Sequence, residues 1–281
     1  LQYKIIEVDG QKCNSKWDVY ALKNSMIPNV LRESRVDLLE LEKPENIKRI
    51  KERFKERENI TNKRYLKEID ETDLSVDVDE DWYEVRPNNA SAIVFCPHRK
   101  GSLGVYDNDS GTCKGVATTV KSAMGEDNVS TFVGGDSLEG QDKFIKGETS
   151  IMVATKAFGM GIDKPNVRFT VNIVHSGSLE AFVQEAGRAG RDRKMALATI
   201  LFCPKEFMEQ NQRTRLMESV PVDFGVHKFF YDGNFIGEDF EKIVMYYLLA
   251  HNATTVSDEE DTPLPKITSD SVQGFMKALL N

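Results

Sequence analysis

Residues 150–194 read SIMVATKAFGMGIDKPNVRFTVNIVHSGSLEAFVQEAGRAGRDRK. They begin with a short apolar run at 151–154, which is long enough for a buried strand and too short for a helix. A polar loop follows, and its glycines, Gly159 and Gly161, let the backbone take left-handed conformations or approach a ligand closely. A second apolar run at 169–174 predicts the next strand. The pattern therefore predicts two buried strands joined by a loop that can approach a ligand.

A helix with an arginine-rich end is expected after the second strand. Ser178 is placed to cap its N-terminus, because a serine hydroxyl accepts hydrogen bonds from backbone N–H groups that the first helical turn leaves unpaired. The helix ends in QEAGRAGRD, residues 184–192, in which Arg188 and Arg191 share a face if the turn stays helical. Two planar, permanently charged guanidinium groups on one patch are suited to phosphate oxygens, which they bind bidentately.

These residues resemble the C-terminal RecA-like motor domain of superfamily 2 helicases, most closely the RecQ-like branch. Residues 154–168 are similar to motif V of that family, and residues 184–192 are similar to motif VI. Two motifs in the expected order and spacing are a more specific signal than one glycine pattern. The alternative is a flavodoxin-like domain with a chance arginine turn. The resemblance implies an α/β fold: a RecA-like parallel sheet flanked by helices, with extra α-rich segments at the N-terminal and C-terminal ends.

Changes in composition divide the chain into three predicted parts. Residues 1–88 form an N-terminal segment and acidic linker, since residues 70–84 contain many Asp and Glu and no Lys or Arg. Residues 89–215 form the helicase-like RecA-like domain. Residues 216–281 form a C-terminal helical extension, with a helix expected at 240–250.

Other local patterns predict elements around the motifs. A turn-rich loop at 101–111 is expected to be an insertion before a helix that starts at Thr112. Residues 197–202 predict a further strand. Pro204 is then placed to begin a helix that contains Phe207.

Three positions are implied by the resemblance to hold nucleic-acid phosphates. Arg99 follows a strand-like run and matches an Arg of motif IV. Gly135 offers a backbone N–H after the next strand-like run, where Val133 stands in place of a family His. Thr155 follows the motif V strand, although it serves equally as the cap of the following turn. Phosphate contacts of this kind position a DNA strand, single or at a duplex junction, without reading its sequence.

The resemblance also assigns a nucleotide role to the arginine turn. Arg191 matches the arginine finger of the family, and Arg188 is its companion. Gln184 is expected to contact the closed nucleotide, while Asp163 and Gly161 lie where motif V couples the nucleotide to the nucleic acid. The alternative for Asp163 is that it satisfies loop amides.

The phosphate-binding loop GxxxxGK[ST] does not occur in the sequence. We therefore expect ATP with Mg²⁺ to be held mainly by an N-terminal RecA-like domain outside this sequence, and this chain alone to be inactive. An acidic loop at 258–261 resembles a metal-holding helicase box, but it lies after the arginine turn and is interpreted as a solvated turn. The first residue is Leu1, so we expect a piece of a longer protein.

Composition also limits the kinds of function and site that the chain can have. A net charge of -8 argues against nucleic-acid binding over the whole surface, although a narrow groove can still be locally basic. The four cysteines form no C-x-x-C pair, so neither zinc nor a disulfide framework is expected, and we expect a cytoplasmic location. No apolar run approaches the length of a membrane span.

Three functional hypotheses remain. The preferred one is the C-terminal half of an ATP-dependent DNA helicase, because both arginines and the motif V loop are present. The second is a non-catalytic nucleic-acid-binding or scaffold remnant, which the missing phosphate loop favours. The third is half of an RNA helicase.

Overall fold

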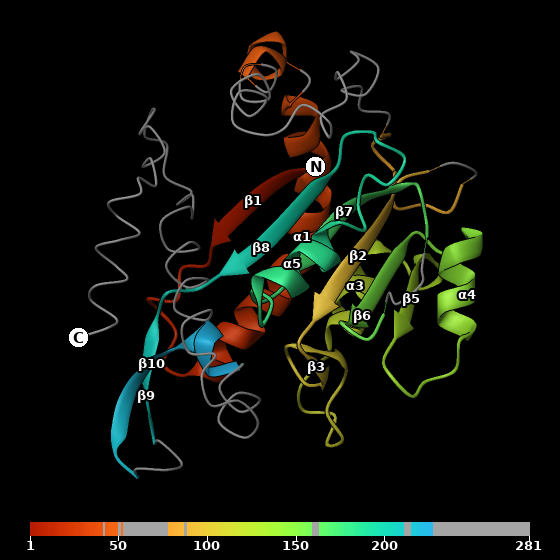
Figure 1. Cartoon of the computed structure of the whole chain (residues 1–281). Helices are drawn as coiled ribbons and strands as arrows, with labels where there is room; N and C mark the ends of the chain where they lie inside the picture. The colour runs from red at the N-terminus through yellow and green to blue at the C-terminus, as the bar shows by residue number, and fades with distance from the viewer. Residues whose placement is uncertain are drawn as a thin grey trace.

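The computed structural model describes residues 1–41, 43–49, 52, 78–86, 89–158, 163–210 and 215–226. Its centre is a six-stranded sheet in the order β1-β8-β7-β2-β6-β5, in which every neighbouring pair is parallel (Figure 1). The strands are β1 Gln2–Glu7, β2 Ser91–Cys96, β5 Val129–Phe132, β6 Ile151–Thr155, β7 Val167–Asn172 and β8 Leu197–Phe202. This arrangement confirms the α/β prediction of a RecA-like parallel sheet flanked by helices.

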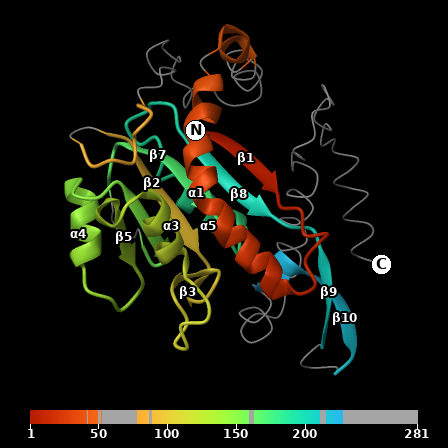
Figure 2. The ribbon, with the colours of Figure 1, turned by 180° about the vertical axis from the view of Figure 1, so that it is seen from behind.

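Helices cover both faces of the sheet. They are α1 Lys16–Glu40, α3 Val116–Met124, α4 Glu139–Lys146 and α5 Leu179–Ala186, with a short 3-10 helix at Glu126–Asn128. α5 lies in front of the sheet in Figure 1, whereas α1 and α3 lie on the opposite face, which Figure 2 turns toward the reader. Strands buried on both faces read as continuous apolar runs, which explains the apolar sequences of the central strands.

The alternation of side chains along β2 shows how the two faces differ. Ala92 and Val94 belong to the core cluster that contains the buried residues of α1 and α3. Ile93 and Phe95 point to the other face, where they cluster with Phe144 of α4. Successive side chains of a strand point to opposite faces, so this one strand contributes to both cores.

The N-terminal residues take part in the same core. β1 pairs with β8 along its whole length, and α1 packs over the sheet after a capping box in which Ser15 and Asp18 bond each other's backbone N–H groups. The division into segments 1–88, 89–215 and 216–281 stays a prediction. Both β1 and α1, on the N-terminal side of residue 88, contribute buried residues to the main core cluster.

A buried ion pair ties α1 to the end of the sheet. The ammonium of Lys23 is fully buried and donates to both carboxylate oxygens of Asp223, at 2.6 and 2.7 Å. It also donates to the carbonyl oxygens of Ile173 and Leu201, while the backbone N–H of Cys203 donates to Asp223. The charged groups are therefore hydrogen-bonded as burial requires.

The predicted helix at Pro204 is wrong. Strands β9 Glu206–Gln210 and β10 Met217–Pro221 form an antiparallel hairpin instead. Phe207 and Val220 lie opposite each other in this hairpin, and Val220 is buried, so cross-strand packing overrides the helical signal. The described part of the predicted C-terminal extension thus begins as a strand. The predicted helix at 240–250 and the acidic loop at 258–261 lie outside the described residues.

The bounds of two shorter elements also differ from the prediction. The turn-rich segment at 101–111 contains a short strand, β4 Gly104–Tyr106, paired with β3 His98–Lys100. The next helix starts at Val116 rather than Thr112, because Asp107 accepts a hydrogen bond from the backbone N–H of Gly115 and thereby holds the preceding residues in a turn. Within the described parts of the chain, no helix has both the length and the apolar character that a membrane crossing requires.

Candidate functional site

The arginine turn follows α5 directly. Ser178 caps this helix as predicted, since its Oγ accepts from the backbone N–H of Ala181 at 3.1 Å. The helix ends at Ala186, so the two arginines lie in turns and not on one helical face. Gly190 has φ +71, and its N–H donates to the carbonyl of Val167, the first residue of β7, at 2.9 Å. The turn is therefore anchored at the amino end of β7.

The turn presents one arginine to a weakly held carboxylate. Arg191 Nη1 lies 3.1 Å from Asp163 Oδ1, and the side chain of Asp163 is 82% exposed. An ion pair this exposed contributes little stability, so a stronger anion can replace the carboxylate. Arg188 lies close enough to be affected by its neighbour: burial first, and then the charge of Arg191, lower the pKa of the Arg188 guanidinium, whereas Glu185 raises it.

A second ion pair holds the turn in place. The buried guanidinium of Arg168, on β7, binds both carboxylate oxygens of Asp192, with Nη1 to Oδ1 at 2.9 Å. Burial raises the pKa of Asp192, but hydrogen bonds from Arg168 and from the backbone N–H of Lys194 outweigh it and leave the pKa lowered. Sequence reasoning missed this pair. The signal was a single arginine inside an otherwise apolar strand.

Buried Glu185 joins α5 to the end of β7. Its Oε2 accepts from Asn172 Nδ2 and Ser176 Oγ, both at 2.5 Å. Burial raises the pKa of this carboxyl, while the two hydrogen bonds and the charges of Lys156 and Arg188 lower it in part. The prediction did not include Glu185. A buried acid beside a cationic turn is a typical positioning group.

The side chain of Gln184 forms a hydrogen bond within its own helix. It is exposed, and its Nε2 donates to Glu180 Oε1, one helical turn earlier, at 3.1 Å. Gly161, the remaining predicted nucleotide residue, lies outside the described residues. Of the predicted nucleotide residues, the structure thus brings together Arg191 and Asp163, with Arg188 next to them.

The predicted nucleic-acid residues gather at the opposite end of the sheet. Arg99 follows β2, Gly135 follows β5, and Thr155 is the last residue of β6, in register with Cys96 of β2. Carboxyl ends of neighbouring parallel strands meet at one edge, where ligands of open α/β sheets commonly bind. Gly135 has φ +91, a conformation that a side chain disfavours, although the space beside it is open.

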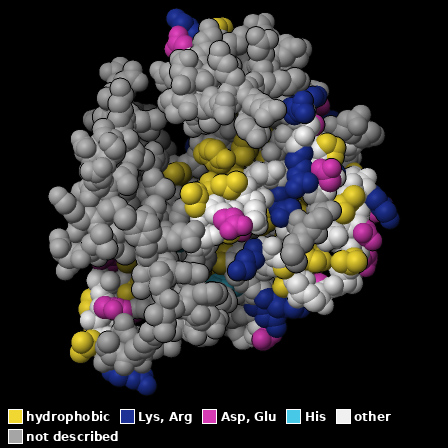
Figure 3. Space-filling model, viewed as in Figure 1, with side chains coloured by type: hydrophobic (Ala, Val, Ile, Leu, Met, Phe, Trp, Pro, Cys, Tyr) yellow, Lys and Arg dark blue, Asp and Glu magenta, His cyan; other side chains and the backbone are white. Residues whose placement is uncertain are grey.

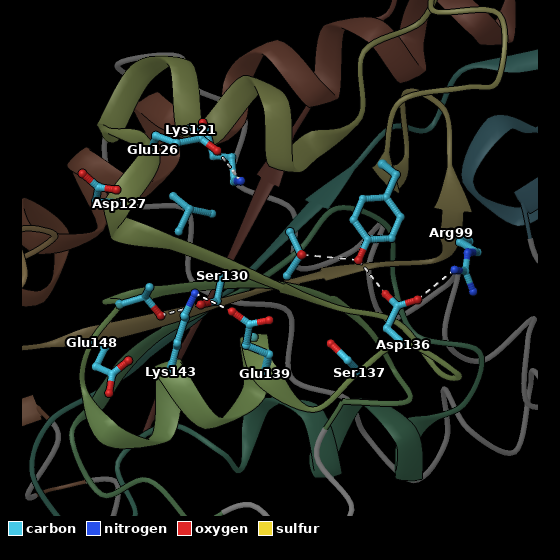
Figure 4. A pocket seen from close by; sticks show the side chains of 15 residues that line it. Arg99, Lys121, Glu126, Asp127, Ser130, Asp136, Ser137, Glu139, Lys143 and Glu148 are labelled. Carbon is cyan, nitrogen blue, oxygen red and sulfur yellow. Dashed lines mark hydrogen bonds and ion pairs between the residues drawn. The ribbon is translucent and has the colours of Figure 1, made fainter.

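Arg99 is bound to an acidic residue that sequence reasoning missed. Its Nη2 donates to Asp136 Oδ1 at 2.8 Å, and Figure 4 shows the two side chains facing each other in a pocket of about 830 Å³. Tyr106 donates from its hydroxyl to the second oxygen of Asp136 at 2.5 Å. Burial first, and then the hydrogen bond to Asp136, raise the pKa of Tyr106. An Asp directly after the glycine pair was the signal available in the sequence.

Comparisons with known proteins show which family the chain is similar to. Residues 83–193 match the family described as the helicase conserved C-terminal domain. Over 72 residues the chain is 47% identical to the ATP-dependent DNA helicase RecQ of Bacillus subtilis (strain 168), which is 26% of this chain and 12% of that protein. Over 131 residues it is 34% identical to the probable ATP-dependent DNA helicase RecS of the same organism, covering 47% and 25% of the two chains. The chain carries a superfamily 2 helicase C-terminal domain of the RecQ-like branch.

The helicase C-terminal domain is a small part of these relatives. The chain spans 12% of the length of RecQ and 25% of the length of RecS. Among solved structures, the Mss116p DEAD-box helicase domain 2 bound to an RNA duplex is similar at a TM-score of 0.37 and 16% identity, covering 72% of this chain and 54% of that chain.

The face of the helicase domain that carries α5 has a local concentration of positive charge. Figure 3 shows Lys and Arg side chains gathered in a band down this face, beside hydrophobic side chains. The band contrasts with the net charge of -8 for the whole chain. Positive charge is thus concentrated locally on this face of an acidic chain. No group of three or more His, Cys, Asp and Glu side chains is arranged for a metal ion within the described residues.

Proposed function

We propose that this chain is the C-terminal motor half of an ATP-dependent DNA helicase and that its arginine turn supplies charge to the γ-phosphate of ATP. The observation that carries the proposal is the turn itself. Arg191 is presented at the surface on a turn anchored by the pair between buried Arg168 and half-buried Asp192. A guanidinium on a rigid support is pre-organised for a phosphoryl group.

Arg191 acts when the cleft between two motor lobes closes. In phosphoryl transfer, negative charge spreads over the transferred group in the transition state, so a guanidinium that arrives on closure favours that state over the ground state. A phosphate can readily replace Asp163 as the partner of Arg191, because this carboxylate is exposed. Arg188 adds a second positive charge, and Glu185 positions it. The exposed Gln184 contacts the nucleotide, while Asp163 and Gly161 couple it to the DNA.

The residues present fit one side of a nucleotide. Two guanidinium groups in one turn match phosphate oxygens, and ATP with Mg²⁺ supplies the phosphoryl group when bound. The metal and most of the nucleotide are held by an N-terminal RecA-like domain of the longer protein. Arg99, Gly135 and Thr155 hold DNA phosphates at the carboxyl edge of the sheet, so they position the strand without reading its sequence.

The test uses the longer protein that contains both motor domains. Arg191→Ala should lower DNA-stimulated ATP turnover by roughly 10³-fold or more, with the KM for ATP nearly unchanged. This corresponds to about 4 kcal/mol of transition-state stabilisation. Arg191→Lys should restore little, because an ammonium cannot reproduce the planar guanidinium fork.

The matched control is Arg193→Ala, because Arg193 is an exposed arginine two residues along the same turn. It should keep turnover near the wild-type rate. A higher KM with unchanged turnover in Arg191→Ala would make Arg191 a ground-state binder and refute the finger role. Unwinding of matched DNA and RNA duplexes by the wild-type protein tests the substrate, and a preference for RNA would overturn the DNA assignment.

A further inference from the structure

A second groove lies at the amino edge of the sheet, away from the carboxyl-edge residues. Its volume is about 780 Å³. Three segments form most of its walls: residues 84–86 and 89–91 before and at the start of β2, residues 145–150 at the end of α4 and beyond it, and residues 163–166 before β7. Asp163, Arg168 and Asp192 also border this groove, but none of the roles assigned above uses Lys164.

Lys164 lines the groove and is almost wholly buried, with 6% of its surface exposed. Its Nζ lies 5.1 Å from the ring centroid of Phe144, a cation–π contact. In the described part of the chain, no carboxylate lies within ion-pair distance of this ammonium. Burial lowers the pKa of Lys164, and no neighbouring acid opposes that shift.

The other buried cations of the described residues are paired. Lys23 binds Asp223, and Arg168 binds Asp192. The side chain of Lys164 is buried, but its ammonium has no such partner in the described part of the chain. An anion in the groove would supply that partner.

The rest of the groove limits the size of that anion. Lys146, in the last turn of α4, adds positive charge to the wall, as do Arg86 and Lys194, and Asn166 adds a polar side chain. Acidic side chains also line the groove: Glu84, Glu148, Asp163 and Asp192, the last of which is paired with Arg168. These carboxylates repel a long polyanion such as a nucleic-acid backbone, whereas a compact anion can sit at the ammonium itself.

We propose that Lys164 forms a binding subsite for a single small oxyanion of the phosphate type. The ammonium donates to the anion, and the Phe144 ring holds the ammonium in place. This subsite does not depend on the proposed motor function, because it needs neither ATP nor DNA.

The test measures thermal unfolding of the 281-residue chain with increasing inorganic phosphate, at an ionic strength held constant with chloride. The wild-type midpoint should rise in a saturable way, by on the order of 5–10 °C when phosphate reaches a hundred times its Kd. Equilibrium dialysis with labelled phosphate should give one site per chain. A parallel series with AMP distinguishes a free oxyanion from the phosphomonoester end of a larger ligand, and a Lys164-dependent rise with either anion supports the proposal.

Lys164→Met should lose this response. In chloride alone its midpoint should equal or exceed that of the wild type, because the variant removes an unpaired buried charge. The matched control is Lys143→Met, since Lys143 lies on α4 next to Phe144 and pairs with Glu139 outside this groove. It should keep the phosphate response.

Three results would overturn the proposal. The first is a wild-type chain with no saturable response to either anion. The second is an undiminished response in Lys164→Met. The third is a Lys164→Met variant that unfolds at a lower temperature than the wild type in chloride or does not fold, which would show that the ammonium is needed for the fold itself.

Discussion

Replacing Asp136 with Asn tests the proposed role of Arg99 in DNA binding. In the structure Arg99 is half exposed, and its Nη2 is held by Asp136 at 2.8 Å. The carboxylate therefore competes with any DNA phosphate for the guanidinium. Asparagine keeps the size of the side chain and can still accept a hydrogen bond from Tyr106, but it removes the negative charge.

The expected effect is a gain of affinity for single-stranded DNA. An exposed ion pair contributes about 0–1 kcal/mol, so releasing Arg99 costs little. A hydrogen bond to a charged group is worth about 1.5–3 kcal/mol. After the cost of ordering the side chain, we expect a gain of about 0.7–1.4 kcal/mol, which is roughly three- to tenfold in Kd at low salt. One additional phosphate contact should steepen the plot of log K against log salt by about 0.7.

Fluorescence anisotropy with labelled single-stranded DNA, measured over a salt series, gives both quantities for the 281-residue chain. Asp37→Asn is the matched control, because it makes the same charge change on α1 and releases Lys4 of β1 from an ion pair of 2.6 Å. The double variant Arg99→Ala/Asp136→Asn should show no gain over Arg99→Ala. Unchanged affinity and salt slope in Asp136→Asn, or weaker binding, would refute the reasoning and show that Asp136 does not restrain Arg99.

Three further outcomes are expected for the isolated chain. It should hydrolyse ATP no faster than background in a phosphate-release assay, and DNA-stimulated turnover would contradict the division of the nucleotide site between two domains. Lys23→Met should lower the free energy of unfolding by about 3–5 kcal/mol, because it leaves the carboxylate of Asp223 buried and unpaired; the melting temperature should fall by about 6–20 °C, whereas Lys4→Met should change it little. Asp192 has a lowered pKa in the folded chain, so its stabilising contribution is present above the unfolded pKa of about 3.9 and is lost as the pH falls through the folded pKa. Asp192→Asn should therefore flatten this acid limb of a stability-against-pH curve, and an unchanged limb would show that its pairing with Arg168 does not contribute.

The sequence alone predicted the elements whose signals are local. The apolar runs that became β2, β6 and β8 are buried on both faces, and a run of this kind is legible without knowing its neighbours. The Ser178 cap is a contact within one helical turn, so its letters sufficed. Motifs V and VI were legible for a similar reason, since each is a continuous stretch of chain. The RecA-like fold and the helicase branch followed from these signals.

Only the tertiary structure decided which charges meet. Asp136 and Arg99 lie on different loops, Asp192 reaches back to Arg168, and Lys23 finds Asp223 almost at the other end of the described chain. The identity of a charged residue does not reveal its partner, because the partner depends on which strand ends the fold brings to one edge. In the described part of the chain, that no carboxylate lies within ion-pair distance of Lys164 is likewise a property of how the groove packs.

The same limit explains the wrong helix after Pro204. Local preference there allows a helix, but the segment has a second strand, β10, available a few residues later. Pairing with β10 satisfies the backbone hydrogen bonds of β9 and places Phe207 opposite Val220, so a contact between two segments outweighed the preference of one. Similarly, Arg188 and Arg191 do not share a helical face, because α5 ends at Ala186. The backbone N–H of Gly190 donates to the carbonyl of Val167, the first residue of β7, instead of to the preceding helix.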